Sequence, residues 1–218
     1  MIIILDMGSG ETCKNDPYQV RAMIDAVDDA DNREVEIILK WQLFRGGEFA
    51  HLRALHPGVF ALAYDYARSK GYATTASVFD YESVDFLTGF RIPFFKYACL
   101  PSDQLPLGWD AGYWEYPRVM SYGNTEHENE IKIHSPTPHR LACVREYPAK
   151  SDDYVDRFSY EQLTRGISDH TDHSLGMMMY GYKPELYETH FCLDWQDGPD
   201  TGPFALRPEQ LRDMLEAL

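Results

Sequence analysis

The sequence predicts a small (β/α)8 barrel of the TIM type, formed by residues 1–218 as a single domain. Eight short runs rich in apolar and β-branched residues recur along the chain, and helix-like segments separate most of them. Polar residues follow most of these runs, which is the arrangement expected at the carboxyl-terminal face of a parallel barrel. An open doubly wound sheet is the alternative architecture. It usually has a glycine-rich first turn, whereas Gly8-Ser-Gly10 lacks a third glycine and a helix directly behind it.

The strands are predicted where apolar residues run between turn residues. The first run is too short for a secretory signal and lacks the basic residues that flank one, so it is interpreted as a buried strand. Side chains alternate between the two faces of a strand, so Lys40 and Gln42 lie on the same face of their strand, and Glu188 and His190 lie on the same face of theirs. The eight predicted strands are 2–7, 35–41, 73–79, 92–98, 116–121, 140–146, 164–168 and 186–192.

The helices are predicted from amphipathic patterns with recognisable ends. Residues 17–29 follow an Asp-Pro start, and 48–69, the longest segment, end at Lys70-Gly71. The connections 101–115 and 122–139 contain prolines and polar residues and predict little helix, so the barrel should be near the lower size limit of its class. The remaining predicted helices are 81–89, 174–181 and 208–217.

The composition excludes several classes of function. A formal net charge of −15 disfavours nucleic acid as a partner, because the long-range field repels phosphate. No apolar run approaches the roughly 20 residues that a membrane helix needs. The four cysteines have no paired short spacing, so we expect no disulfide scaffold and a reducing, cytoplasmic location.

Two histidines in the last quarter of the chain stand at the polar ends of consecutive predicted strands. Imidazoles from adjacent strands can converge on one divalent metal, with carboxylates nearby to complete its shell. A single histidine in such a place is more often a satisfied surface or core residue, but the pair predicts a metal site. The pair is His170 and His190, and its candidate neighbours are Ser168, Asp169, Glu188 and Asp200.

Lys40 and Lys96 interrupt apolar runs, where a lysine is costly to bury unless an anion meets it. The alternative is that each lysine reaches solvent from a frayed strand end. Together with Arg145 and the serines at other strand ends, they predict a cradle for phosphate or carboxylate. A metal beside that cradle predicts a metal-assisted reaction on a small anionic substrate. The polar residues expected to ring the site are Asp6, Lys40, Gln42, Ser77, Asp80, Lys96, Ser121, Arg145, Tyr147, His170 and His190.

These motifs resemble, in order and over most of the chain, the N-acetylneuraminate (sialic acid) synthase family of condensing barrels. The two motifs in the last quarter are the most specific of the set. The matching motifs are Lys40-x-Gln42, Ser77-x-Phe79-Asp80, Phe95-Lys96, Ser121-x-Gly123, Cys143 with Tyr147-Pro148, Ser168-Asp-His-Thr171, and His190-Phe with Gly198-Pro-Asp200.

The resemblance implies a condensation of phosphoenolpyruvate with an N-acetylated aldose, giving a 2-keto sugar acid and phosphate. It implies that His170 and His190 hold Mn²⁺ or Mg²⁺, and that Lys40, Lys96 and Asp6 are catalytic, with Asp6 in the place of a family glutamate. The residues implied for substrate binding are Lys40, Ser77, Lys96, Cys99, Ser121 and Ser168 for phosphoenolpyruvate, and Gln42, Tyr147 and Asp200 for the sugar, with Arg145 beside them.

Three departures from the family pattern qualify this expectation. Cys99 replaces a serine, Pro101 replaces a glutamate with a role in proton handling, and Arg145 replaces an asparagine. The family's C-terminal antifreeze-like domain, which covers the partner's site in a dimer, has no counterpart within these residues, so we expect a truncated form and keep a homodimer as an option.

Two other functions remain open at this point. One is a metal-dependent aldolase or lyase acting on another sugar acid, with the pocket altered through Cys99, Pro101 and Arg145. The other is a catalytically degenerate barrel that binds a sugar or phosphate, or that scaffolds a partner.

Overall fold

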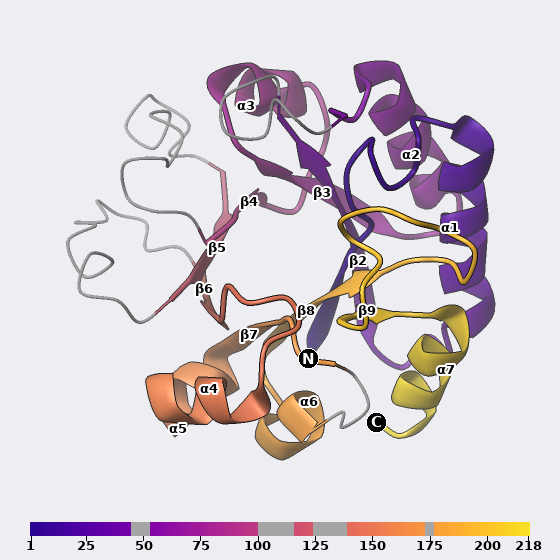
Figure 1. Cartoon of the computed structure of the whole chain (residues 1–218). Coiled ribbons are helices and arrows are strands. Elements are labelled where there is room, and N and C mark those ends of the chain that lie inside the picture. Colours follow the sequence, from indigo (N-terminus) through magenta and orange to yellow (C-terminus); the bar gives the residue numbers. More distant parts are fainter. Residues whose placement is uncertain (45–52, 100–115, 124–138, 173–176) are drawn as a thin grey trace.

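Eight parallel strands close into a barrel in the computed structural model, which describes residues 1–44, 53–99, 116–123, 139–172 and 177–218 (Figure 1). Each strand pairs with the next along the chain, and β8 pairs back with β1, which confirms the predicted TIM barrel. A two-residue strand, β9 (Ala205–Leu206), pairs in parallel with the end of β8. The barrel strands are β1 (Ile2–Asp6), β2 (Glu36–Leu43), β3 (Ala73–Val78), β4 (Phe95–Tyr97), β5 (Arg118–Tyr122), β6 (His139–Cys143), β7 (Gly166–Asp169) and β8 (Leu186–Phe191).

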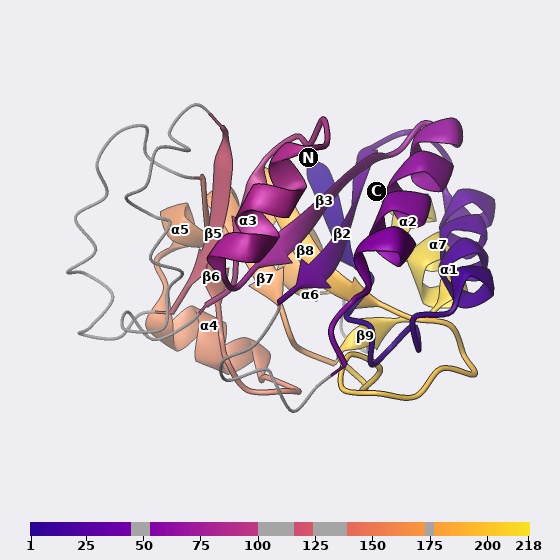
Figure 2. The same cartoon turned by 90° about the horizontal axis from the view of Figure 1, so that it is seen from above.

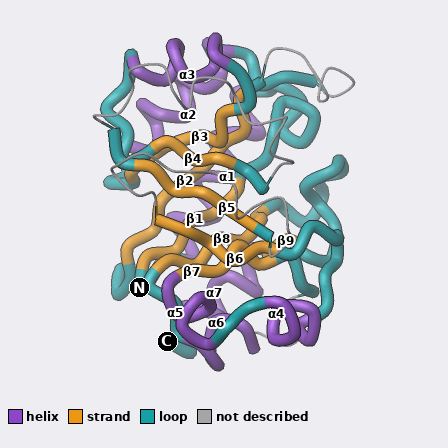
Figure 3. The backbone as a smooth tube through the Cα atoms, turned by 90° about the vertical axis from the view of Figure 1, so that its left-hand side faces the viewer, coloured by secondary structure: helices purple, strands orange, loops and turns teal. Residues whose placement is uncertain are grey.

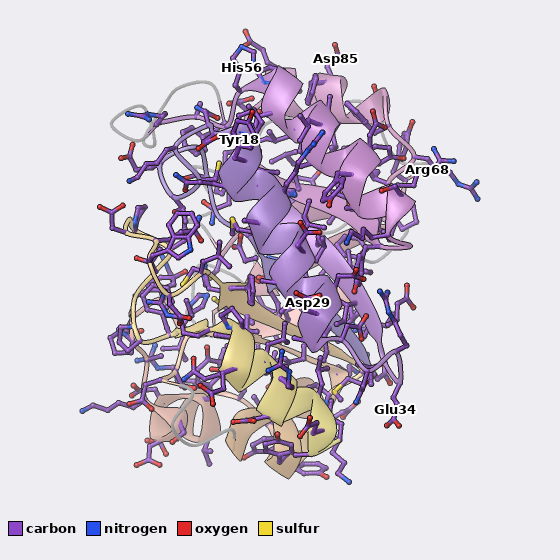
Figure 4. The ribbon with its side chains drawn as sticks, turned by 90° about the vertical axis from the view of Figure 1, so that its right-hand side faces the viewer. Tyr18, Asp29, Glu34, His56, Arg68 and Asp85 are labelled. Atoms are coloured by element: carbon purple, nitrogen blue, oxygen red, sulfur yellow. The ribbon has the colours of Figure 1, made fainter. Side chains whose placement is uncertain are left out.

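The helices pack around the outside of the strands (Figures 2 and 3). In Figure 4 the first helix lies between the second and the last, with Tyr18 and Asp29 near its two ends and His56 and Arg68 near the ends of its neighbour. Among the described residues, no helix is long and apolar enough to cross a bilayer. The helices are α1 (Pro17–Ala30), α2 (Pro57–Ser69), α3 (Tyr81–Thr88), α4 (Ser151–Arg157), α5 (Tyr160–Arg165), α6 (Met177–Tyr182) and α7 (Pro208–Glu216).

Helix α2 begins at Pro57, so the predicted start at residue 48 was wrong. The His56 side chain accepts a hydrogen bond from the backbone N–H of Gly58 (3.1 Å), and Pro57 takes the first helical position, where it needs no donor. The described residues before them, 53–55, are not helical. Residues 45–52, the predicted connection 101–115, and residues 124–138 of the predicted connection 122–139 lie outside the described residues.

Helices α4 and α5 and strand β9 were not predicted. All three elements are short. The start of α5 is fixed by a capping box, in which Ser159 and Gln162 exchange reciprocal hydrogen bonds over the first turn. Helix α5 also occupies residues 164 and 165, so the seventh strand begins at Gly166, two residues later than predicted.

The inside of the barrel has an apolar floor, and the site rests on it. Six apolar side chains from six strands or strand ends form a separate buried cluster. Each of them lies two positions before a polar or thiol-bearing residue of the next layer, for example Ile4 before Asp6 and Phe94 before Lys96. Because inward-facing side chains recur every second residue, the same strands that pack the floor present polar groups above it. The floor consists of Ile4, Ile38, Phe94, Val119, Leu141 and Leu186.

Candidate active site

A cavity of about 420 Å³ opens at the carboxyl ends of the strands. This is within the size range of small-molecule sites. Every residue that the resemblance implied for the site lines it, although the roles of these residues stay predictions. The lining consists of Asp6, Lys40, Gln42, Ser77, Phe79, Lys96, Ala98, Cys99, Ser121, Cys143, Arg145, Tyr147, Ser168, His170, Glu188, His190, Pro199 and Asp200.

Strand register brings these residues together although they are far apart in sequence. Asp6 on β1 is level with Lys40 on one side and with His190 on the other. Ser77 on β3 is level with Lys96, and Ser168 on β7 is level with Glu188. The register therefore sets Lys40 beside Asp6, Lys96 beside Ser77 and Glu188 beside Ser168, all of which line the cavity.

Lys40 is buried, with 2% of its surface exposed, so the alternative of a solvent-reaching lysine is wrong. Its ammonium group lies 2.6 Å from a carboxylate oxygen of Asp6 and donates to the hydroxyl of Ser77 at 2.9 Å. Burial works to lower the pKa of Lys40, but the charges of Asp6 and Glu188 outweigh it, and the pKa is raised. Lys40 is thus a fixed cation.

Lys96 is buried as well, with 1% exposed, and it donates to the hydroxyl of Ser121 at 2.8 Å. Its ammonium lies 3.1 Å from a carboxylate oxygen of Glu188. Burial is the largest influence on Lys96 and lowers its pKa, in spite of the favourable charge of Glu188. The two lysines therefore differ: Lys40 faces two carboxylates, and Lys96 faces one.

Glu188, which was expected only as a carboxylate near the histidine pair, is the central residue of the site. Its Oε1 accepts a hydrogen bond from the Ser168 hydroxyl at 2.8 Å, and its Oε2 lies 3.8 Å from the ammonium of Lys40. That second oxygen is buried and has no hydrogen-bond partner among the described residues. Burial favours a raised pKa, but the ammonium groups of Lys40 and Lys96 prevail and hold the pKa of Glu188 below its usual range. The carboxylate is therefore charged, with one oxygen available.

The two histidine rings face each other across the cavity, with centroids 5.7 Å apart. The Nδ1 of His170 lies 2.6 Å from the backbone carbonyl of Val144 and must carry the proton, so its Nε2 has the lone pair. That nitrogen accepts from the hydroxyl of Tyr147 at 3.1 Å. Burial, and next the charge of His190, lowers the pKa of His170 to about 3, so the ring is neutral. A neutral imidazole is the form that binds metals.

A divalent metal fits the donors of this pair. The Nδ1 of His190 is buried and has no hydrogen-bond partner among the described residues. It lies 3.8 Å from Asp6 and 3.7 Å from Asp200. No group of three or more His, Cys, Asp and Glu side chains in the described ranges stands in a metal-binding arrangement, so the protein would supply two imidazoles and leave other positions open.

Asp200 fastens the loop after β8 to the loop after β1. Its Oδ2 accepts from the Thr12 hydroxyl at 2.5 Å and from the backbone N–H of Ser9 at 3.2 Å, while its Oδ1 accepts from Gln42 at 3.0 Å. Gly8 has φ +78°, and a Cβ at this position would lie 2.6 Å from the Asp200 carboxylate. Glycine is therefore needed where the two loops meet.

Two residues predicted near the site belong elsewhere. Asp169 points away from the cavity, where it accepts hydrogen bonds from Tyr187 at 2.6 Å and Thr171 at 2.7 Å. Asp80 caps helix α3 through the backbone N–H of Ser83 at 2.8 Å and does not line the cavity. Pro101 lies outside the described residues.

Comparisons with known proteins find one matching family model and several related proteins. Residues 47–218 match the model of the NeuB family. The spore coat polysaccharide biosynthesis protein SpsE of Bacillus subtilis is 26% identical over 170 residues, which is 71% of this chain and 45% of that protein. The chain thus spans less than half the length of this curated relative.

Solved structures of a sialic acid synthetase and of SpsE have the same fold as this chain. The N-acetylneuraminic acid (sialic acid) synthetase of Leptospira borgpetersenii superposes with a TM-score of 0.74 at 20% identity, covering 98% of this chain and 81% of that one. The structure of B. subtilis SpsE gives a TM-score of 0.74 at 23% identity, covering 99% and 66%. At these identities the likeness establishes the fold.

Proposed function

This chain belongs to the NeuB family, and on that premise we propose that its cavity condenses phosphoenolpyruvate with an aldose to give a 2-keto sugar acid. The observation that carries the proposal is the pair of buried lysines, each with a serine hydroxyl at hydrogen-bond distance. Buried cations next to hydroxyl donors form a site for a small dianion or trianion. The sugar would lie above them, toward Gln42 and Asp200.

The reaction joins C3 of phosphoenolpyruvate to the aldehyde carbon of the aldose. The aldehyde oxygen takes up a proton and becomes a hydroxyl, water adds at C2, and phosphate leaves as C2 becomes the ketone. The sum is phosphoenolpyruvate, aldose and water giving 2-keto sugar acid and phosphate. His170 and His190 would hold the divalent metal, Mn²⁺ or Mg²⁺, which when bound supplies Lewis-acid polarisation of a carbonyl.

We assign the proton handling to Glu188. In the family pattern this task involves a glutamate at the position of Pro101, which cannot titrate. Glu188 has a buried oxygen without a hydrogen-bond partner among the described residues, and its pKa is held down by the two lysines. The carboxylate is therefore ionised, and that buried oxygen can take the proton of the water that adds at C2.

Metal-dependent phosphate release that requires both substrates is the test. Phosphoenolpyruvate would be incubated with a panel of aldoses and with Mn²⁺ or Mg²⁺, and phosphate and the 2-keto acid would be measured. Glu188→Gln should lose turnover by about 100-fold or more, whereas Glu185→Gln, the same change at an exposed position just before β8, should keep it. Phosphoenolpyruvate that stays intact with every aldose and both metals would rule out the condensation.

A second function is favoured by the cavity positions at which the chain departs from the family. Cys99 and Arg145 both line the cavity, so a changed substrate is chemically reasonable. The alternative is a metal-dependent aldolase or lyase that cleaves another sugar acid. Mass spectrometry of a sugar-acid panel incubated with the protein and metal, without phosphoenolpyruvate, would detect that cleavage.

A further inference from the structure

The charged side chains of the cavity are paired unequally. Lys40 and Lys96 have their charges balanced by Asp6 and Glu188. The guanidinium of Arg145 lines the same cavity, yet among the described residues it makes no hydrogen bond, ion pair or aromatic contact. Arg145 is therefore the cation of the cavity lining that no carboxylate among the described residues balances.

Arg145 lies at the mouth of the cavity, not on its floor. It follows β6 by two residues and is exposed, whereas Cys143, at the end of the same strand and on the same face, is buried. Tyr147 is the next residue on that face, and its hydroxyl contacts His170. Arg145 thus stands on the β6 side of the rim, two residues before the tyrosine that contacts both histidines.

We propose that Arg145 binds the phosphate of a phosphorylated aldose, so that the second substrate of this site is an aldose phosphate. This inference rests on the proposed condensation. A guanidinium presents two parallel N–H donors that match a phosphate. Because no carboxylate of the described ranges pairs with Arg145, those donors can meet a phosphate without first breaking an ion pair there. The charge of −15 makes the protein as a whole unattractive to anions, so a cation at the mouth has a selective effect.

The deep end of the cavity accounts for phosphoenolpyruvate without Arg145. Two ammonium groups and the hydroxyls of Ser77 and Ser121 already converge there. The exposed guanidinium at the rim is better placed for the outer end of the second substrate, at the far side from its aldehyde. The site then has one anion position on its floor and another at its mouth, separated by the sugar.

Binding without turnover gives the first test. Isothermal titration with Mn²⁺ present and phosphoenolpyruvate absent would compare hexoses and N-acetylhexosamines with their 6-phosphates. We expect the wild-type protein to bind one aldose phosphate at least about tenfold more tightly than its neutral partner, the gain typical of a charge-assisted contact. Arg145→Gln should remove this preference, and Arg145→Lys should keep part of it. Lys150→Gln is the matched control, because it removes one exposed cation a few residues away that does not line the cavity.

Kinetics give the second test. In Arg145→Gln, KM for the aldose phosphate should rise about tenfold, while KM for phosphoenolpyruvate stays within twofold of wild type. A rise confined to KM for phosphoenolpyruvate would overturn the assignment, and so would equal binding of neutral and phosphorylated aldoses. A protein that binds the aldose phosphate through Arg145 but leaves phosphoenolpyruvate intact would instead refute the proposed condensation and support the binding subsite.

Discussion

Replacing Glu188 by Gln removes the carboxylate that the two buried lysines share, while the shape of the side chain is kept. The oxygens of Glu188 lie 3.1 Å from Lys96 and 3.8 Å from Lys40. With an effective dielectric constant of about 20, unit charges at these distances attract by about 5 and about 4 kcal/mol. The cost of burying the carboxylate itself offsets part of this, and losing one partner of a buried pair costs about 3–5 kcal/mol in practice.

We therefore expect Glu188→Gln to lower the free energy of unfolding by about 3–5 kcal/mol. For a chain of this length, that corresponds to a fall in Tm of about 6–20 °C. Calorimetry in a phosphate-free buffer would measure it, with Glu185→Gln as the control expected to stay within about 0.5 kcal/mol of wild type.

The effect of added phosphate on Tm tests whether Lys40 and Lys96 form an anion-binding site or only a structural ion-pair cluster. In Glu188→Gln the ammonium groups of Lys40 and Lys96 have lost a counter-charge, so added phosphate should raise the Tm of this variant more than that of the wild type. If the variant is as stable as the wild type, or if phosphate shifts both proteins equally, the reasoning about the lysine pair is refuted.

Three other predictions follow from the same geometry. The folded-state pKa of Glu188 is below its unfolded value of about 4.3. The contribution of this carboxylate to stability is therefore present above that pH and is lost as the pH falls. Urea unfolding across pH 3–7 should show the difference in stability between wild type and Glu188→Gln shrinking as the solution becomes more acidic. Gly8→Ala should cost about 1–3 kcal/mol in urea unfolding, because φ is +78° there and the new Cβ would meet Asp200; an unchanged midpoint would contradict this. The thiol of Cys143 should resist iodoacetamide in the native protein at pH 8 and react after unfolding, because a hydrogen bond with Cys99 and burial raise its pKa. Peptide mass spectrometry would follow the labelling, and rapid labelling of the native protein would disprove the prediction.

Most of the cavity could be predicted from the sequence because its parts follow a simple periodicity. In a parallel barrel the strand ends share one face, and side chains on that face recur every second residue. Asp6 ends an apolar run, and Lys40 and Lys96 interrupt apolar runs close to their ends, so the sequence places all three on the cavity face before any coordinates are known. The apolar residues two positions earlier form the floor for the same reason.

The misses came from facts that periodicity does not contain. Glu188 gains its importance from Lys40 and Lys96, which come from strands β2 and β4, and the stagger that brings them together depends on strand register. Asp169 lies between two inward-facing residues, and alternation alone should have turned it outward, toward Tyr187. The start of α2 is indicated by the His56-Pro57 pair, a cap followed by a proline at the first helical position, but the apolar pattern continues before this pair and predicted a longer helix.

The contact between Asp200 and Ser9 joins positions 191 residues apart. A ribosome adds about 5–20 residues per second, so about 10–40 s separate the synthesis of one side of this contact from that of the other. During that interval β1 has no β8 to pair with, and Lys40 has Asp6 as a counter-ion but lacks Glu188. The wall between the first and last strands is completed last, so the cavity has its full set of lining residues only when Asp200 has been made.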